Sequence, residues 1–238
     1  MNGTRAVVVT VPRDASATAI LDAVEIASPR PVILLFGGAA GLDRSRESHL
    51  ATLFSDGVAA LAAELGALII DGGTQSGIMA IMGEAVAATP GTVQLLGVAP
   101  KGKITDPEIA GAPKISDGAP LEPNHSHFVL VESNEWGGET GKMLELARAL
   151  NAPIVAILVN GGAIAADEAL QSVRNGWQLL VVEGSGRFAD ELSAAIRDGQ
   201  SAKSTKVTEI ACSGHVALFN VDDAAEKLKD ELRRLLSG

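Results

Sequence analysis

The chain has 238 residues, of which 47% are hydrophobic and 20% are charged, and its formal net charge is −10. Its 19 lysines and arginines form no basic block, so the clustered positive face of a nucleic-acid-binding protein is not expected. A single cysteine, Cys212, excludes an intrachain disulfide, and the absence of any apolar run near the roughly 20 residues of a membrane span favours a cytoplasmic protein without membrane insertion.

Short β-branched runs alternate with longer segments of helical periodicity along the whole chain. The runs predict strands over 6–11, 32–36, 67–71, 94–99, 127–132, 154–159 and 179–182, and a C-terminal hairpin of 207–211 and 216–221 around a Ser-Gly turn. The helical periods predict helices over 15–27, 47–65, 76–88, 139–150, 165–174, 188–196 and 223–236.

The central strands read as continuous apolar runs, for example VILLF at 32–36 and IVAILV at 154–159. Such runs are typical of strands buried on both faces by helices. Together with the alternation of strands and helices, they predict an α/β fold with a Rossmann-like, doubly wound, mostly parallel sheet and helices on both faces. The length fits a single domain over residues 1–238.

Four of the expected strands run directly into glycine-rich turns, at 34–43, 69–79, 158–168 and 182–190. One such turn is more often structural than functional, because glycine simply permits tight turns. Four turns at the carboxyl edge of one parallel sheet instead favour a phosphate-bearing small molecule, held by free N–H groups at the following helix N-termini.

Two common nucleotide fingerprints are absent from these turns. The chain contains no G-x-x-x-x-G-K-[ST] sequence, which disfavours a P-loop triphosphatase. Gly72, Gly73 and Gly77 follow a G-G-x-x-x-G spacing rather than G-x-G-x-x-G, which disfavours an ordinary dehydrogenase.

Five stretches of the chain, which together span about residues 32–196, resemble the SLOG superfamily. The resemblance is strongest to its branch related to the N-terminal region of melastatin-type TRP channels. It implies a Rossmann-like domain that binds nucleotides or NAD-derived signals, with ADP-ribose as the ligand in some channels. The stretches are FGGA (36–39), DGGTQSGIMAIMGEA (71–85), PNHSHFVLVE (123–132), PIVAILVNGG (153–162) and LLVVEGSGRFADEL (179–192).

The resemblance carries the ligand-contacting arginine onto Arg187 and the first and third glycine turns onto their counterparts here. Phe36 stands where the channel-type turn often has Thr, and GGETGKMLELARAL (137–150) holds no placeable second ligand arginine. From the resemblance we expect ADP-ribose, NAD or a related nucleotide as the ligand, and we expect that no cofactor is required. The expected ligand-binding residues are Gly37, Gly38, Ala39, Gly72, Gly73, Thr74, Gly77, His127, Glu132, Gly161, Gly162, Gly184, Ser185, Gly186 and Arg187.

A second SLOG branch, the Lonely Guy phosphoribohydrolases, has P-G-G-x-G-T-x-x-E at the third turn, where this chain reads NGGAIAADE (160–168). Glu168 matches the glutamate, but Ile164 and Ala165 replace the Gly-Thr step and supply neither glycine's freedom nor a hydroxyl. Three functions remain open: a ligand-binding sensor, an N-glycosidase or phosphoribohydrolase using Glu168, and an assembly module with a decayed site. A sensor would act through a separate effector protein or a homo-oligomer.

The sequence allows two interpretations for several residues. Arg187, one residue into a helix that Ser185 is expected to cap, either meets an anion or pairs with Asp190 or Glu191. His125 and His127 form a His-x-His pair, but a metal ion needs further ligands with suitable spacing, so no metal site is expected. Glu132 either holds a ribose hydroxyl or caps the next helix. The irregular segment 101–126 is either a lid over the site or a surface loop.

Overall fold

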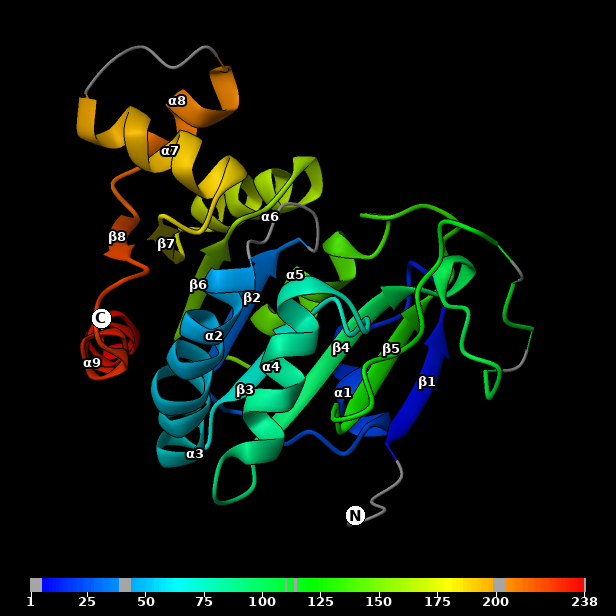
Figure 1. Ribbon diagram of the computed structural model, residues 1–238. Coiled ribbons are helices and arrows are strands. Elements are labelled where there is room, and N and C mark those ends of the chain that lie inside the picture. The colour runs from blue at the N-terminus through cyan, green and yellow to red at the C-terminus, as the bar shows by residue number, and fades with distance from the viewer. Residues whose placement is uncertain (1–5, 39–43, 110, 114, 199–203, 238) are drawn as a thin grey trace.

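The computed structural model describes residues 6–38, 44–109, 111–113, 115–198 and 204–237. Its centre is an eight-stranded sheet in the order β1-β5-β4-β3-β2-β6-β7-β8, and every neighbouring pair is parallel (Figure 1). This arrangement confirms the predicted fold class. The strands are β1 Val7–Val11, β2 Val32–Gly37, β3 Leu68–Asp71, β4 Gln94–Pro100, β5 His127–Val131, β6 Ile154–Val159, β7 Gln178–Glu183 and β8 Val216–Asn220.

Helices cover both faces of the sheet and enclose a separate hydrophobic core on each side. One core is closed by α1 (Ala17–Ala23), α5 (Thr140–Ala149), α6 (Ala163–Arg174), α7 (Arg187–Asp198) and α8 (Thr205–Ala211). The other is closed by α2 (Arg44–Thr52), the π-helix η1 (Leu53–Ala59), α3 (Ala60–Leu65), α4 (Gly77–Ala88) and α9 (Ala225–Ser237). Among the described helices, none is both long and apolar enough to cross a membrane.

The apolar runs of the central strands are buried on both faces, as the sequence predicts. Along β2, Leu34 and Phe36 lie in the core beneath α5 and α6, whereas Ile33 and Leu35 lie in the core beneath α4 and α9. Successive strand residues point to opposite faces, so a sheet with two cores needs an apolar residue at every position.

The predicted C-terminal hairpin is wrong. Residues Thr205–Ala211 form helix α8 instead of a strand, and β8 pairs in parallel with β7, with Leu179 opposite Val216. Val207 and Ile210 are three residues apart, so a helix directs both into the core, where they are completely buried. A short apolar run of this kind fits a helix as well as a strand until its neighbours are known.

Two further segments differ in detail from the predicted elements. The predicted helix 47–65 is a continuous helical run of α2, η1 and α3. The irregular segment 101–126 begins with a 3-10 turn, η2 (Lys101–Lys103), and forms two isolated bridges, Ile104 with Ala119 and Thr74 with Leu121. It therefore packs against the turn after β3.

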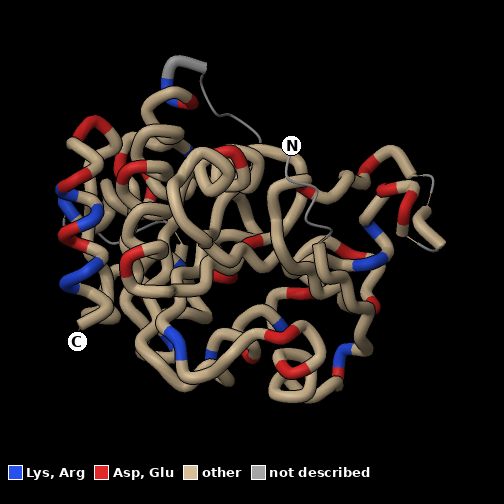
Figure 2. Tube along the Cα trace, turned by 90° about the horizontal axis from the view of Figure 1, so that it is seen from below, with Lys and Arg blue, Asp and Glu red and all other residues tan. Residues whose placement is uncertain are grey.

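Charged residues are dispersed over the chain (Figure 2). Along α9, near the C-terminus, basic and acidic residues alternate and form ion pairs such as Arg234 with Glu231 and Arg233 with Asp230. These positive charges are therefore neutralised locally.

The chain leaves the two central strands in opposite directions. After β2 it enters the helices of one face and returns as β3, whereas after β6 it enters α6 on the other face and returns as β7. The adjacent carboxyl ends of β2 and β6 are thus the topological switch point, where doubly wound folds leave a crevice for ligands.

Candidate functional site

Three of the four glycine turns meet at the switch point, and Asn160 at the end of β6 links them. The completely buried Asn160 donates from Nδ2 to the Gly38 carbonyl (3.4 Å) and from its backbone N–H to Ser185 Oγ (2.7 Å). The Ala189 N–H in turn donates to the Asn160 carbonyl (2.9 Å). We call the turns 37–38, 160–162 and 184–187 the switch-point crevice.

Arg187 reaches across this crevice from the fourth turn. A Cβ atom on Gly38 would lie 3.6 Å from Arg187 Nη1, and one on Gly162 would lie 2.9 Å from Nη2, so the guanidinium packs against both backbones. Arg187 has φ = 45°, an uncommon conformation for a residue with a side chain. Such outliers cluster at ligand sites, where the surrounding structure holds them in place.

Helix α6 begins at the same point. Its N-cap residue, Gly162, makes no side-chain capping bond, so the helix presents backbone N–H groups toward the crevice beside the Arg187 guanidinium. The expectation that Ser185 caps the next helix is wrong. Ser185 Oγ donates to the Val182 carbonyl (2.5 Å) and accepts from Asn160, and α7 begins at Arg187. Ser185 therefore ties β7 to β6.

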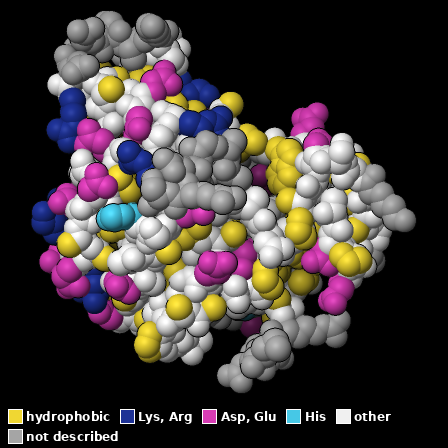
Figure 3. Space-filling view, in the orientation of Figure 1, with side chains coloured by type: hydrophobic (Ala, Val, Ile, Leu, Met, Phe, Trp, Pro, Cys, Tyr) yellow, Lys and Arg dark blue, Asp and Glu magenta, His cyan; other side chains and the backbone are white. Residues whose placement is uncertain are grey.

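A cavity of about 190 Å³ opens on the other side of the first turn of α6. We call it the carboxyl pocket, because Glu139 and Glu168 line it together with Gly37, Gly72, Thr74 and Trp136. In the space-filling view, a hollow beside the irregular segment after β4 has hydrophobic side chains along its rim (Figure 3). Ala119 of that segment also lines the pocket, so part of the segment forms a wall of the site.

The two glutamates of the carboxyl pocket are almost completely buried, with exposed fractions of 5% for Glu139 and 7% for Glu168. Burial raises the pKa of Glu168 to about 8, and the charges of Glu139, Asp167 and Asp71 add to this effect. Burial likewise raises the pKa of Glu139 to about 7. Thr140 Oγ1 is hydrogen-bonded to Glu168 Oε1 (3.4 Å). At neutral pH Glu168 is therefore mostly protonated and Glu139 about half protonated.

We expect Glu168→Gln to flatten the dependence of stability on pH. A carboxyl whose pKa is raised on folding contributes stability below about pH 4.5, and this stability is lost as the pH rises through about 8. Between pH 6 and 9 the wild type should lose on the order of 3 kcal/mol more unfolding free energy than the variant. Urea denaturation across this range measures the difference, with the exposed Glu84→Gln on α4 as control. Parallel pH profiles of wild type and Glu168→Gln would contradict it.

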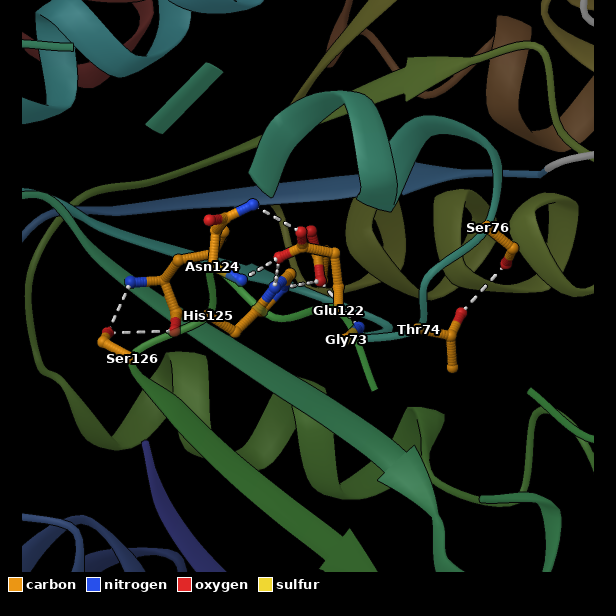
Figure 4. A network of polar contacts seen from close by, with 9 residues as sticks. Gly73, Thr74, Ser76, Glu122, Asn124, His125 and Ser126 are labelled. Carbon is orange, nitrogen blue, oxygen red and sulfur yellow. Dashed lines mark hydrogen bonds and ion pairs between the residues drawn. The ribbon is translucent and has the colours of Figure 1, made fainter. Parts of the chain in front are cut away.

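The second glycine turn is held by a buried network rather than by α4 alone (Figure 4). His125 lies between Asp71 and Glu122, with 2.8 Å from Nε2 to Asp71 Oδ1 and 2.8 Å from Nδ1 to Glu122 Oε2. Asp71 Oδ1 also accepts the Gly73 N–H (2.7 Å), and the Gly73 carbonyl accepts the Glu122 N–H (3.0 Å). The network thus fixes the position of Gly72 and Thr74 in the pocket wall.

His125 carries the charge that this network needs. Burial lowers its pKa, but Asp71 and Glu122 outweigh that effect and raise the pKa to about 9. The protonated ring donates to both carboxylates and stacks on Phe128, with 5.3 Å between ring centroids. Gly83 of α4 is necessary here, because a Cβ atom would lie 2.1 Å from Glu122 Oε2.

The structure brings together most of the expected ligand residues but separates two of them. His127 begins β5 at the amino edge of the sheet, opposite the turns, where Ser126 Oγ contacts its Nδ1 (2.8 Å). Glu132 follows β5 at the carboxyl edge, but it lines another cavity with Arg13 and Lys101. It does not cap the next helix, whose N-cap residue is Glu139.

Several of the expected glycines have structural roles in addition to their place at the site. Gly37 permits β6 and α4 to approach, because its Cβ atom would lie 2.3 Å from the Val159 carbonyl oxygen. Gly73 packs its backbone against Gly97. Positive φ angles occur at Gly73, Gly77, Gly161, Gly184 and Gly186. Ala39 lies outside the described residues.

Several residues at the site were not expected from the sequence, and Glu139, Trp136 and Arg46 are among them. Glu139 and Trp136 line the carboxyl pocket. Arg46 on α2 approaches the fourth turn, where a Cβ atom on Gly184 would lie 3.0 Å from its Nη1. Within the part of the chain that the structure describes, no three His, Cys, Asp or Glu side chains form a group that would hold a metal ion.

Comparison with known proteins shows the family to which this chain belongs. Residues 30–229 match the family described as SLOG in TRPM, prokaryote. The chain is 29% identical over 202 residues to transient receptor potential cation channel subfamily M member 2 of Mus musculus and, equally, of Rattus norvegicus. The member-like 2 channel of Nematostella vectensis is 26% identical over 204 residues. The alignments cover 69–70% of this chain and 13% of each channel. The chain therefore belongs to the prokaryotic family of SLOG domains related to TRPM channels.

Proposed function

We propose that this chain binds a nucleotide or an NAD-derived ligand of the ADP-ribose type, with the ligand's diphosphate at the beginning of α6. The observation that carries the proposal is the Arg187 guanidinium, which packs against Gly38 and Gly162 beside an N-terminus without a side-chain cap. Two positive groups, the guanidinium and the positive end of the helix dipole, converge there. A diphosphate has the charge that complements both groups.

The first and third turns support the same placement. Gly38 and Gly162 leave room for the Arg187 guanidinium against their backbones, because neither carries a side chain into the crevice. Phe36, which replaces the threonine expected in the channel-type turn, is buried in the core and does not occupy the crevice. That replacement therefore leaves the diphosphate position open.

Calorimetric titration with ADP-ribose, NAD, AMP and cyclic ADP-ribose, followed by chromatography of each mixture, tests the proposal. We expect saturable binding of at least one of these ligands, recovered intact. The difference between ADP-ribose and AMP then reports how much the second phosphate contributes. A panel in which none of the four ligands binds would overturn the proposal.

Hydrolysis of an N-glycosidic or phosphoribosyl bond is a second candidate, favoured by Glu168. Its carboxyl has a pKa of about 8, raised mainly by burial, and lines a pocket beside Gly37. A carboxyl that keeps its proton at neutral pH can act as a general acid. Release of free base, nicotinamide or ribose phosphate, abolished in Glu168→Gln while binding persists, would establish this activity. Intact ligand after prolonged incubation would exclude it for the ligands tested.

A further inference from the structure

The carboxyl pocket contains a buried oxygen without a protein partner. Glu139 Oε2 is inaccessible to solvent and forms no hydrogen bond to any described residue. Only 5% of the surface of Glu139 is exposed, and the residue lines the pocket. An unsatisfied buried carboxyl oxygen is costly, so such an atom in a native pocket points to a bound partner.

The second carboxyl makes a cationic ligand group more favourable than a neutral one. Glu168 faces the same cavity, and its pKa is raised first by burial and then by Glu139, Asp167 and Asp71. Of the groups around it, only the Thr140 hydroxyl acts in the opposite direction. A cation between the two carboxyls would permit both to ionise, whereas a sugar hydroxyl would leave their mutual repulsion in place.

The remaining walls of the pocket suit a flat organic cation. Trp136, Met79 and Ile164 line the cavity with apolar surface, and Ile164 is 39% exposed at its mouth. Cations bind favourably over indole faces, and a planar ring fits between apolar side chains. The volume of about 190 Å³ is below the 300–1,000 Å³ or so that encloses a whole drug-sized ligand, so one ring rather than a whole nucleotide fits.

We infer that the carboxyl pocket binds a planar aromatic cation of the pyridinium class, such as the oxidised nicotinamide ring. The pocket and the switch-point crevice flank the same first turn of α6: Ile164 and Glu168 face the pocket, whereas Gly162 and Ala163 face the crevice. The identification of the whole ligand as oxidised NAD rests on the proposed function. The preference of the pocket for a cation is independent of the proposed function.

The test uses two small probes that carry no phosphate: 1-methylnicotinamide, a permanent pyridinium cation, and neutral nicotinamide. The chain has two tryptophans, so a Trp177→Phe background leaves Trp136 as the only indole reporter. We expect 1-methylnicotinamide to quench Trp136 fluorescence with at least tenfold higher affinity than nicotinamide. Equal affinities, or no saturable quenching by the cation, would overturn the inference.

Protonation gives a second, independent readout. Calorimetry of 1-methylnicotinamide in two buffers of different ionisation enthalpy should show release of roughly one proton per ligand at pH 7, as the two carboxyls ionise. Glu139→Gln and Glu168→Gln keep the shape of the side chains and should each remove the preference for the cation. The matched control, Glu84→Gln on the exposed face of α4, should keep it.

Comparison of oxidised with reduced NAD extends the test to the whole ligand. We expect the oxidised form, with its charged ring, to bind at least tenfold more tightly than the neutral reduced form. Arg187→Ala should weaken both forms but leave 1-methylnicotinamide binding unchanged. If neither dinucleotide binds but 1-methylnicotinamide does, the proposed function is wrong and the cation pocket stands. If both NAD forms bind equally, the cation pocket is wrong and the proposed function stands.

Discussion

Replacement of His125 by alanine is expected to lower the unfolding free energy at pH 7 by about 3–5 kcal/mol, because it leaves Asp71 and Glu122 buried without their shared cation. The exposed fractions of the three residues are 3% or less, so bulk solvent does not screen the two carboxylates from each other. Chemical denaturation followed by circular dichroism measures the loss. The exposed His49→Ala on α2 is the control and should change stability by less than about 0.5 kcal/mol.

The pH dependence of the same pair of proteins separates a charge effect from a packing effect. A histidine whose pKa is raised on folding contributes stability that is complete below about pH 6.5 and is lost as the pH rises through about 9. The difference between wild type and His125→Ala should therefore shrink between pH 7 and pH 10. A difference that is constant over this range would mean that His125 acts through packing alone.

Replacement of Arg187 by alanine is expected to weaken nucleotide binding about 10- to 100-fold, because a charge-assisted contact to phosphate contributes roughly 1.5–3 kcal/mol. Calorimetry with the tightest ligand of the panel measures the change. Arg174→Ala removes an arginine from the opposite end of α6, where it pairs with Glu209, and should leave affinity unchanged.

A third variant separates the binding role of Arg187 from its backbone conformation. Arg187→Gly should lose affinity to the same extent as Arg187→Ala but be more stable by about 1 kcal/mol, since glycine adopts φ = 45° without strain. Full nucleotide affinity in both variants would contradict the anion-binding role. Equal stability of both variants would contradict the strain.

Most of the sheet was predictable, because a strand buried on both faces must be apolar at every position. The runs at 32–36 and 154–159 are short and each follows a proline, which favours a strand over a buried helix segment, and the glycines close behind them mark the carboxyl edge. The run at 207–211 was misread because Val207 and Ile210 satisfy both a strand and one turn of an amphipathic helix. Only packing against α6 and α7 decides between them.

The site was predictable where backbone conformation dictates residue type. Gly37, Gly161 and Gly162 are glycines because of close approach or positive φ, and the sequence displays that constraint directly. His127 carried a usable signal that was missed: it begins its strand, so strand polarity alone places it at the amino edge. Glu139 carried no such signal, because its burial depends on how α5 docks beside α6.

A crystal structure of this chain with ADP-ribose bound tests the proposed binding site most directly. The proposed function predicts both phosphates at the first turn of α6, with a phosphate oxygen in contact with the Arg187 guanidinium. The clearest contradiction would be a diphosphate held by Arg13 and Lys101 in the cavity of about 700 Å³ at the ends of β1, β4 and β5. That result would move the site away from the switch point and leave Arg187 as a structural residue.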